Sequence, residues 1–146
     1  MTPSKKIYLG SDHAGFKAKS QLVEKLKKEF PDLEFEDLGN HSEESADYPV
    51  FAKMVAKKVA EQKARGILMC GSGIGMSIAA NKVAGVRAFV SWDVTSARLS
   101  RQHNDTNVLC MGARLLGAEV LMDIARTWLV TDFAGGRHAG RVNQIE

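Results

Sequence analysis

Apolar runs and amphipathic stretches alternate along the 146 residues of this chain. Runs rich in apolar and β-branched residues predict five strands, over residues 6–11, 33–38, 66–70, 86–92 and 107–111. The third run, GILMC, is apolar without interruption, which is typical of a central parallel strand covered on both faces. The second run, LEFEDL, alternates between apolar and acidic residues and therefore fits a position nearer the edge of a sheet.

Helical periodicity fills the segments between these runs. It predicts helices over residues 14–30, 49–63, 73–83, 93–102 and 117–130. In the first of these, Leu22, Leu26 and Phe30 recur at steps of four. Asp93 is a candidate N-cap, and the last helix is followed by two glycines and a short basic tail.

This order of elements predicts one α/β domain over residues 1–146. We expect a three-layer α/β/α, Rossmann-like, doubly wound fold with a five-stranded parallel sheet. Such folds bind ligands beyond the carboxyl ends of their strands. We expect three stretches there: residues 11–13 after the first strand, residues 70–75 after the third, and the region around His103 between the fourth and fifth.

Composition and charge exclude several classes of protein but indicate no site residues. The chain is 45% hydrophobic and 25% charged, which is ordinary for a globular protein. Its net charge of +3 is spread along the chain, which favours a solvated surface with a few anion ligands over nucleic-acid binding. No segment resembles a signal peptide or a membrane span, and Cys70 and Cys110 form no CxxC pair. We therefore expect a cytoplasmic protein with neither a disulfide framework nor a zinc site.

The glycine-rich turn Gly71-Ser72-Gly73-Ile74-Gly75 follows the third strand. Its third glycine comes one residue too early for the dinucleotide-binding pattern, and no Gly-Lys-Ser/Thr follows as in a P-loop. Free N–H groups at a helix N-terminus favour an oxygen-rich, negative ligand. The glycine spacing alone is equally compatible with a tight strand–helix connection that binds nothing.

Cys70 stands directly before this turn, where a helix N-terminus lowers the pKa of a thiol. A cysteine phosphatase needs an arginine six residues on, where Met76 stands, and a redox cysteine needs a partner thiol where Gly73 stands. A general base that moves a proton between carbons needs only a thiolate and donors for the oxyanion, which Ser72 and the glycine N–H groups can supply. Cys110 fits a buried structural cysteine.

The remaining candidates each have a plainer alternative. Asp12 and His13 after the first strand suggest an acceptor for a hydroxyl and a donor to a phosphate or hydroxyl, although an aspartate there can simply cap a helix. His103, in a His-Asn-Asp cluster, is either a cleft residue or a surface residue. Arg137 and Arg141 lie four residues apart on one helical face, as a phosphate clamp would require, or belong to a solvated tail.

Five motifs, in order and spanning nearly the whole chain, resemble those of the type B ribose-5-phosphate isomerases and the related galactose- and allose-6-phosphate isomerase subunits. The motifs are GSDHAGF, DYP, CGSGIGMSIAANK, SRQHNDTNVLCMGAR and GGRHAGR. The resemblance implies a homodimer or a dimer of dimers with shared active sites, into which the C-terminal segment of the neighbouring subunit reaches. It also implies interconversion of ribose 5-phosphate and ribulose 5-phosphate, a pentose phosphate pathway step, without a metal or cofactor.

The resemblance further assigns roles to residues. Cys70 is the base that carries a proton between C1 and C2, and His103 protonates the ring oxygen. Ser72 is a hydroxyl donor beside the enediolate, and Asp12 contacts the sugar. The other implied contacts with the sugar phosphate are His13, Tyr48, Gly71, Gly73, Ile74, Gly75, Asn104, Arg114, Arg137 and Arg141.

Two other functions remain open from the sequence. An isomerase of a six-carbon sugar phosphate, such as allose 6-phosphate, would share these residues and differ in pocket length. A phosphate-binding module without chemistry is the alternative of a different class, because doubly wound folds often serve that purpose.

Overall fold

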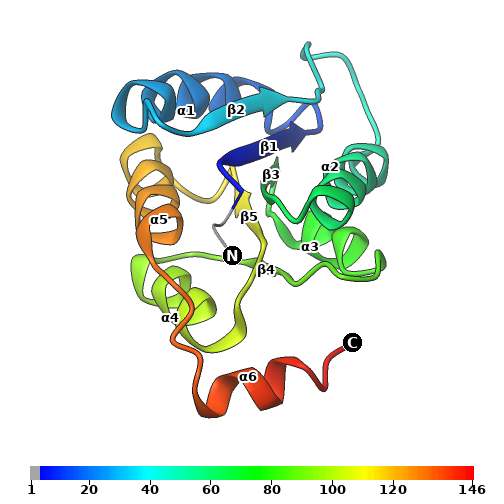
Figure 1. Cartoon of the computed structure of the whole chain (residues 1–146). Helices are drawn as coiled ribbons and strands as arrows, with labels where there is room; N and C mark the ends of the chain where they lie inside the picture. The colour runs from blue at the N-terminus through cyan, green and yellow to red at the C-terminus, as the bar shows by residue number, and fades with distance from the viewer. Residues whose placement is uncertain (1–3) are drawn as a thin grey trace.

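The computed structural model describes residues 4–146 and contains a five-stranded, fully parallel sheet between two layers of helices (Figure 1). The strand order is β2-β1-β3-β5-β4. The strands are β1 (Lys6–Ser11), β2 (Glu34–Asp37), β3 (Arg65–Cys70), β4 (Ala88–Val90) and β5 (Val108–Gly112). This confirms the predicted fold class.

Helices α1 (Phe16–Glu29), α4 (Val94–Asn104) and α5 (Ala118–Val130) cover one face of the sheet, and α2 (Tyr48–Gln62) and α3 (Ile74–Ala80) cover the other (Figure 1). A sixth helix, α6 (Arg137–Val142), packs beside α4 near the C-terminus. The sequence suggested only a basic tail with a helical face there. No helix within residues 4–146 has both the length and the apolar character needed to cross a membrane.

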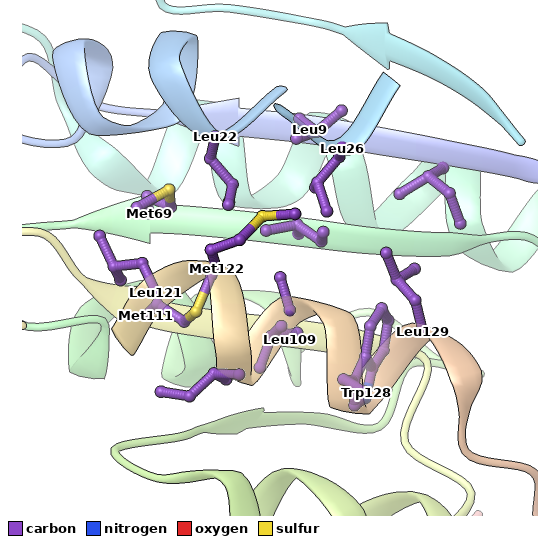
Figure 2. Close-up of a cluster of buried hydrophobic side chains, with 14 of the residues drawn as sticks. Leu9, Leu22, Leu26, Met69, Leu109, Met111, Leu121, Met122, Trp128 and Leu129 are labelled. Carbon is purple, nitrogen blue, oxygen red and sulfur yellow. The ribbon is translucent and has the colours of Figure 1, made fainter. Parts of the chain in front are cut away.

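The central strand β3 has apolar cores on both of its faces, as its uninterrupted apolar run predicts. Ile67 and Met69 point into the core beneath α1 and α5, whereas Leu68 and Cys70 point into the core beneath α2 and α3. Figure 2 shows the first core, in which leucines, methionines and a tryptophan interdigitate between α1, α5 and the strands. Its labelled members are Leu9, Leu22, Leu26, Met69, Leu109, Met111, Leu121, Met122, Trp128 and Leu129.

β4 and α3 are shorter than predicted, and side-chain hydrogen bonds to the backbone lie next to both. β4 has three residues rather than the expected seven. Before it, the Arg87 N–H donates to the Asn107 side chain at 2.7 Å. α3 ends at Ala80 rather than near residue 83, and the Asn81 side chain bonds both backbone groups of Ala88 instead. These contacts leave β4 as a short edge strand paired only with β5.

Candidate active site

Three loops meet at the carboxyl edge of the sheet, after β1, β3 and β5, and their backbones touch at glycines. A Cβ on Gly15 would lie 2.5 Å from the carbonyl oxygen of Met69, and one on Gly112 would lie 2.6 Å from that of Ser72. Gly73 has a φ of +82°, and a Cβ there would lie 2.9 Å from the backbone of Met111. Only glycine fits these contacts, so the three loops form one rigid edge.

Cys70 is the last residue of β3, and its side chain faces the start of the glycine turn. The residue is 5% exposed, and its Sγ accepts a hydrogen bond of 3.1 Å from the Gly73 N–H. Such a donor stabilises negative charge on sulfur. Cys110, by contrast, is fully buried, and burial raises the pKa of its thiol well above the ordinary value. Of the two free thiols, only Cys70 lies beside a backbone donor at the ligand edge.

Asp12 and His13 follow β1 and lie at the same edge. The Asp12 N–H donates to the Met69 carbonyl at 3.3 Å, and its Oδ1 accepts from the Gly15 N–H at 3.1 Å. Asp12 therefore closes the turn before α1 but does not cap the helix, whose N-cap is Gly15. Nδ1 of His13 lies 3.1 Å from the Ala46 N–H and 3.3 Å from the Ala46 carbonyl oxygen, so the backbone of Ala46 orients the ring.

Tyr48 and Arg114 flank the glycine turn. The Tyr48 ring covers Gly75 so closely that a Cβ there would lie 2.7 Å from ring carbons. The Arg114 N–H donates to the Gly71 carbonyl at 3.0 Å, and its side chain lies over that glycine. Ser72 turns its hydroxyl toward the helix start, where Oγ accepts from the neighbouring N–H of Ile74 at 3.2 Å.

A buried lysine that the sequence did not single out fixes the loop after β2. Lys19 of α1 donates to Asp37 Oδ1 at 2.6 Å and to the Asn40 carbonyl at 2.7 Å. Burial lowers the pKa of this ammonium, and the contact with Asp37 offsets part of that effect. The loop is further tied to β1, because the Ser11 N–H donates to the Gly39 carbonyl at 2.8 Å. These contacts hold the loop after β2 in place beside the residues that lead into Asp12 and His13.

The expectation that His103 follows a carboxyl end of the sheet is wrong. Between β4 and β5, only the few residues before α4 lie at the carboxyl edge. The eleven residues of α4 then return the chain to the amino edge of the sheet. His103 and Asn104 come just before Val108, which begins β5, whereas Cys70 is level with Gly112 at its end. A parallel strand rises about 3.3 Å per residue, so β5 separates the two edges by roughly 13 Å.

At the amino edge His103 has neighbours of its own. Its ring stacks on His138, with centroids 4.3 Å apart and the planes 14° from parallel. His138 belongs to α6, which also carries Arg137 and Arg141. Burial lowers the pKa of His138, and the positive charges of His103 and the two arginines lower it further. The sequence missed His138, although it lies between the two arginines of GGRHAGR.

One chain therefore presents two groups of candidate residues at opposite edges of its sheet. The carboxyl edge holds Asp12, His13, Tyr48, Cys70, Gly71, Ser72, Gly73, Ile74, Gly75 and Arg114. The amino edge holds His103, Asn104, Arg137 and Arg141. Residues 4–146 contain no cluster of three His, Cys, Asp or Glu side chains suited to a metal ion.

Comparison with known proteins gives consistent matches over nearly the full chain. The model of the ribose/galactose isomerase family matches residues 7–145. Ribose-5-phosphate isomerase B of Escherichia coli is 49% identical, over 97% of this chain and 94% of that protein. The structure of ribose-5-phosphate isomerase B from Clostridium thermocellum has a TM-score of 0.92 and 48% identity, covering 96% of this chain and 94% of that one. The Mycoplasma genitalium enzyme, solved with bound ribulose 5-phosphate, has a TM-score of 0.90 and 39% identity, covering 96% and 93%.

Proposed function

Because this chain belongs to the ribose/galactose isomerase family, we propose that it is an aldose–ketose isomerase that interconverts D-ribose 5-phosphate and D-ribulose 5-phosphate. The observation that carries the proposal is the Cys70 thiol at the carboxyl edge, with its Sγ 3.1 Å from the Gly73 N–H. The relatives named ribose-5-phosphate isomerase B support this substrate. The chain acts as one sugar-phosphate isomerase domain.

In the proposed reaction the Cys70 thiolate removes the proton from C2 of the open-chain aldose. The C–H electrons form a C1–C2 double bond, and the carbonyl pair moves onto O1, which becomes an oxyanion. That charge is stabilised by N–H groups of the Gly71–Gly75 turn other than those of Gly73 and Ile74, which donate to Cys70 and Ser72. O1 then gains the proton that O2 gives up, with the Ser72 hydroxyl between them. The Cys70 thiol returns its proton to C1, which leaves the ketose and a regenerated thiolate.

The residues around Cys70 hold the rest of the sugar. Asp12 accepts hydrogen bonds from sugar hydroxyls through the oxygen that does not bind Gly15, and the His13 ring contacts the sugar phosphate beside it. Tyr48 forms a wall over Gly75, and Arg114 places a positive charge beside Gly71. These contacts also orient C1 and C2 before proton transfer.

We further propose that a twofold homodimer completes each site. Ring opening needs a proton on the ring oxygen, and His103 of its own chain lies at the wrong edge to supply it to the sugar at Cys70. His103 and Asn104 of the partner subunit instead reach the ring, and Arg137 and Arg141 of the partner subunit bind the phosphate.

The surface around β4 supports such a contact. β4 is a free edge strand, and Trp92, Val94 and Leu99 expose large apolar side chains next to it. A cleft of about 660 Å³ runs along this edge between α4 and the chain end near Ile145. An open edge and contiguous apolar side chains are typical of a surface that another protein covers.

One assay tests the function directly. The purified protein is incubated with ribose 5-phosphate and, separately, with allose 6-phosphate, and ketose formation is followed. Faster turnover of ribose 5-phosphate supports the proposal, whereas preference for allose 6-phosphate assigns a six-carbon substrate. Binding of both without ketose formation would leave the chain as a phosphate-binding module. Two free thiols at residues 70 and 110 suit the reducing cytoplasm, where we place the protein.

A further inference from the structure

A second cleft, of about 450 Å³, opens at the amino edge of the sheet, and basic side chains dominate its charged lining. The basic lining residues come from the end of α2, the starts of β3 and β4, and helix α4: Lys63, Arg65, Arg87 and Arg101. Only two acidic residues, Asp105 and Asp132, line the same cleft. None of these six residues belongs to the group around Cys70.

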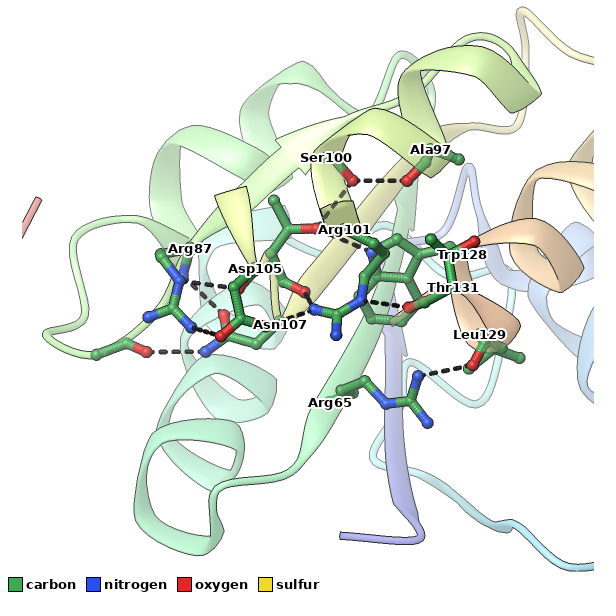
Figure 3. Close-up of polar contacts among 12 residues, drawn as sticks. Arg65, Arg87, Ala97, Ser100, Arg101, Asp105, Asn107, Trp128, Leu129 and Thr131 are labelled. Atoms are coloured by element: carbon green, nitrogen blue, oxygen red, sulfur yellow. Dashed lines mark hydrogen bonds and ion pairs between the residues drawn. The ribbon is translucent and has the colours of Figure 1, made fainter. Parts of the chain in front are cut away.

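Arg65 is the most unusual residue of this cleft, because its half-buried side chain forms no ion pair with a carboxylate of residues 4–146. Its guanidinium lies 5.7 Å from the centre of the Trp128 ring, and Nη1 donates to the Leu129 carbonyl at 3.0 Å (Figure 3). Among residues 4–146, its buried Nε has no hydrogen-bond partner. Burial and, to a smaller extent, the positive charge of Arg101 lower the pKa of Arg65 to about 10, although Asp132 offsets part of their effect.

The guanidinium groups of Arg87 and Arg101 share the carboxylate of Asp105, and Arg101 also donates from Nε to the Thr131 carbonyl at 3.1 Å. Asp105 Oδ1 lies 2.9 Å from Arg101 Nη1, and Asp105 Oδ2 lies 3.4 Å from Arg87 Nη2 (Figure 3). Glu146 adds a longer contact of 3.5 Å to Arg87. Within the described part of the chain, neither Lys63 nor Arg65 forms an ion pair. Positive charge on the Arg65 side of the cleft is therefore unbalanced.

We propose that this cleft is a binding site for a small polyanion with a phosphate or pyrophosphate group, held by Lys63, Arg65 and Arg101. Guanidinium groups match phosphate oxygens with paired N–H donors, and an anion would relieve the repulsion between Arg65 and Arg101. The volume of about 450 Å³ lies within the range of small-molecule sites, so the cleft can hold more than a single phosphate. The site lies at the amino edge of the sheet, whereas Cys70 lies at the carboxyl edge. The proposal therefore does not depend on the proposed isomerase function.

The test uses inorganic pyrophosphate as the probe and the ¹⁵N-labelled full-length protein. Two NMR signals report on the cleft: the side-chain N–H of Arg65, and the indole N–H of Trp128, which donates to Thr106 at 3.0 Å. The backbone amides of Gly71–Gly75 report on the Cys70 edge. We expect saturable shifts of the two cleft signals, with a dissociation constant separate from any binding at the glycine turn.

Matched variants separate a built site from general charge attraction. Lys63→Gln and Arg65→Gln should each weaken pyrophosphate binding at the cleft about tenfold, as expected for the loss of one charge-assisted hydrogen bond. Arg98→Gln removes the same charge from an exposed position of α4 outside the cleft and should change nothing. Lys63 is exposed, so its variant keeps the test valid if Arg65→Gln does not fold.

Three results would overturn the proposal. The first is pyrophosphate shifts confined to the Gly71–Gly75 amides. The second is cleft shifts that do not saturate. The third is an equal loss of affinity in Arg98→Gln and Lys63→Gln. Because the readout is binding at named signals, failure of the isomerase assay would leave this result unaffected.

Discussion

Within one chain, Cys70 lies at the carboxyl edge of the sheet, whereas Arg137 and Arg141 lie at the amino edge. Mixing variants of these residues therefore tests whether each active site is shared between two subunits. Cys70→Ala removes the proposed base, and Arg141→Ala removes a proposed phosphate ligand at the other edge of the sheet. Each variant should form homodimers with little activity, because both of their sites carry the same lesion. Neither change is expected to unfold the chain, since Arg141 is exposed and Cys70→Ala removes only a sulfur at the sheet edge.

The expected recovery follows from the geometry of a twofold dimer. If Arg141 acts on the partner's Cys70, a mixed dimer has one site with both lesions and one site with neither. Equal mixing makes about half of the dimers mixed, so roughly a quarter of all sites should regain activity. If Arg141 acts within its own chain, every site keeps one lesion and the recovery is zero.

The two proteins are unfolded together, refolded and assayed for ribulose 5-phosphate formation from ribose 5-phosphate. Mass spectrometry of intact dimers measures the mixed fraction, and each variant refolded alone provides the baseline. A second mixture, of Cys70→Ala with Arg114→Ala, is the matched control, because both of those residues lie at the carboxyl edge. That mixture should regain nothing. Confirmed mixed dimers without recovered activity in the first mixture would refute the shared site.

Three further predictions concern single residues. Cys70→Ala should lower kcat roughly a hundredfold or more with little change in sugar-phosphate affinity, because a general base acts mainly in the transition state; stopped assays and calorimetry measure both, and near-normal turnover would exclude Cys70 as the base. His103→Ala should impair turnover of cyclic ribose 5-phosphate more than that of ribulose 5-phosphate, whose esterified C5 oxygen prevents furanose closure through C2; equal losses, with the same slow step in pre-steady-state traces, would contradict ring opening by His103. Cys110→Ala should leave activity largely intact and reduce the loss of stability at alkaline pH. The raised pKa of Cys110 keeps its proton on the folded chain, whereas the thiol of the unfolded chain ionises near 9.0. The contribution of this thiol to the free energy of unfolding therefore falls as pH rises above that value. Denaturant unfolding at pH 8 and pH 10 checks this, and a parallel fall in both proteins would contradict it.

The sequence predicted the fold and the carboxyl-edge group well because both depend on local patterns. The uninterrupted run before Cys70 indicated a central parallel strand, and residues directly after such a strand must lie at its carboxyl edge. The same rule does not extend to His103, because that residue precedes a strand. A helix rises about 1.5 Å per residue, so the eleven residues of α4 move its end by roughly 16 Å.

Other features depend on contacts between distant segments and have no local signal. His138 stacks on His103 from a helix that begins 34 residues later in the chain. The guanidinium of the half-buried Arg65 lies against the Trp128 ring of α5, and nothing near Arg65 in the sequence predicts that contact. Likewise, Lys19 occurs among several lysines of α1, and only the fold selects it to hold the loop after β2.

Because α4 carries His103 away from the Cys70 of its own chain, the proposed turnover depends on protein concentration. In the proposed arrangement, a folded chain without a partner has a thiol but no acid for the sugar ring. Dilution below the dissociation constant of the dimer would therefore abolish turnover even in chains that stay folded. In a cell with few copies, doubling the number of chains would more than double the flux through this step.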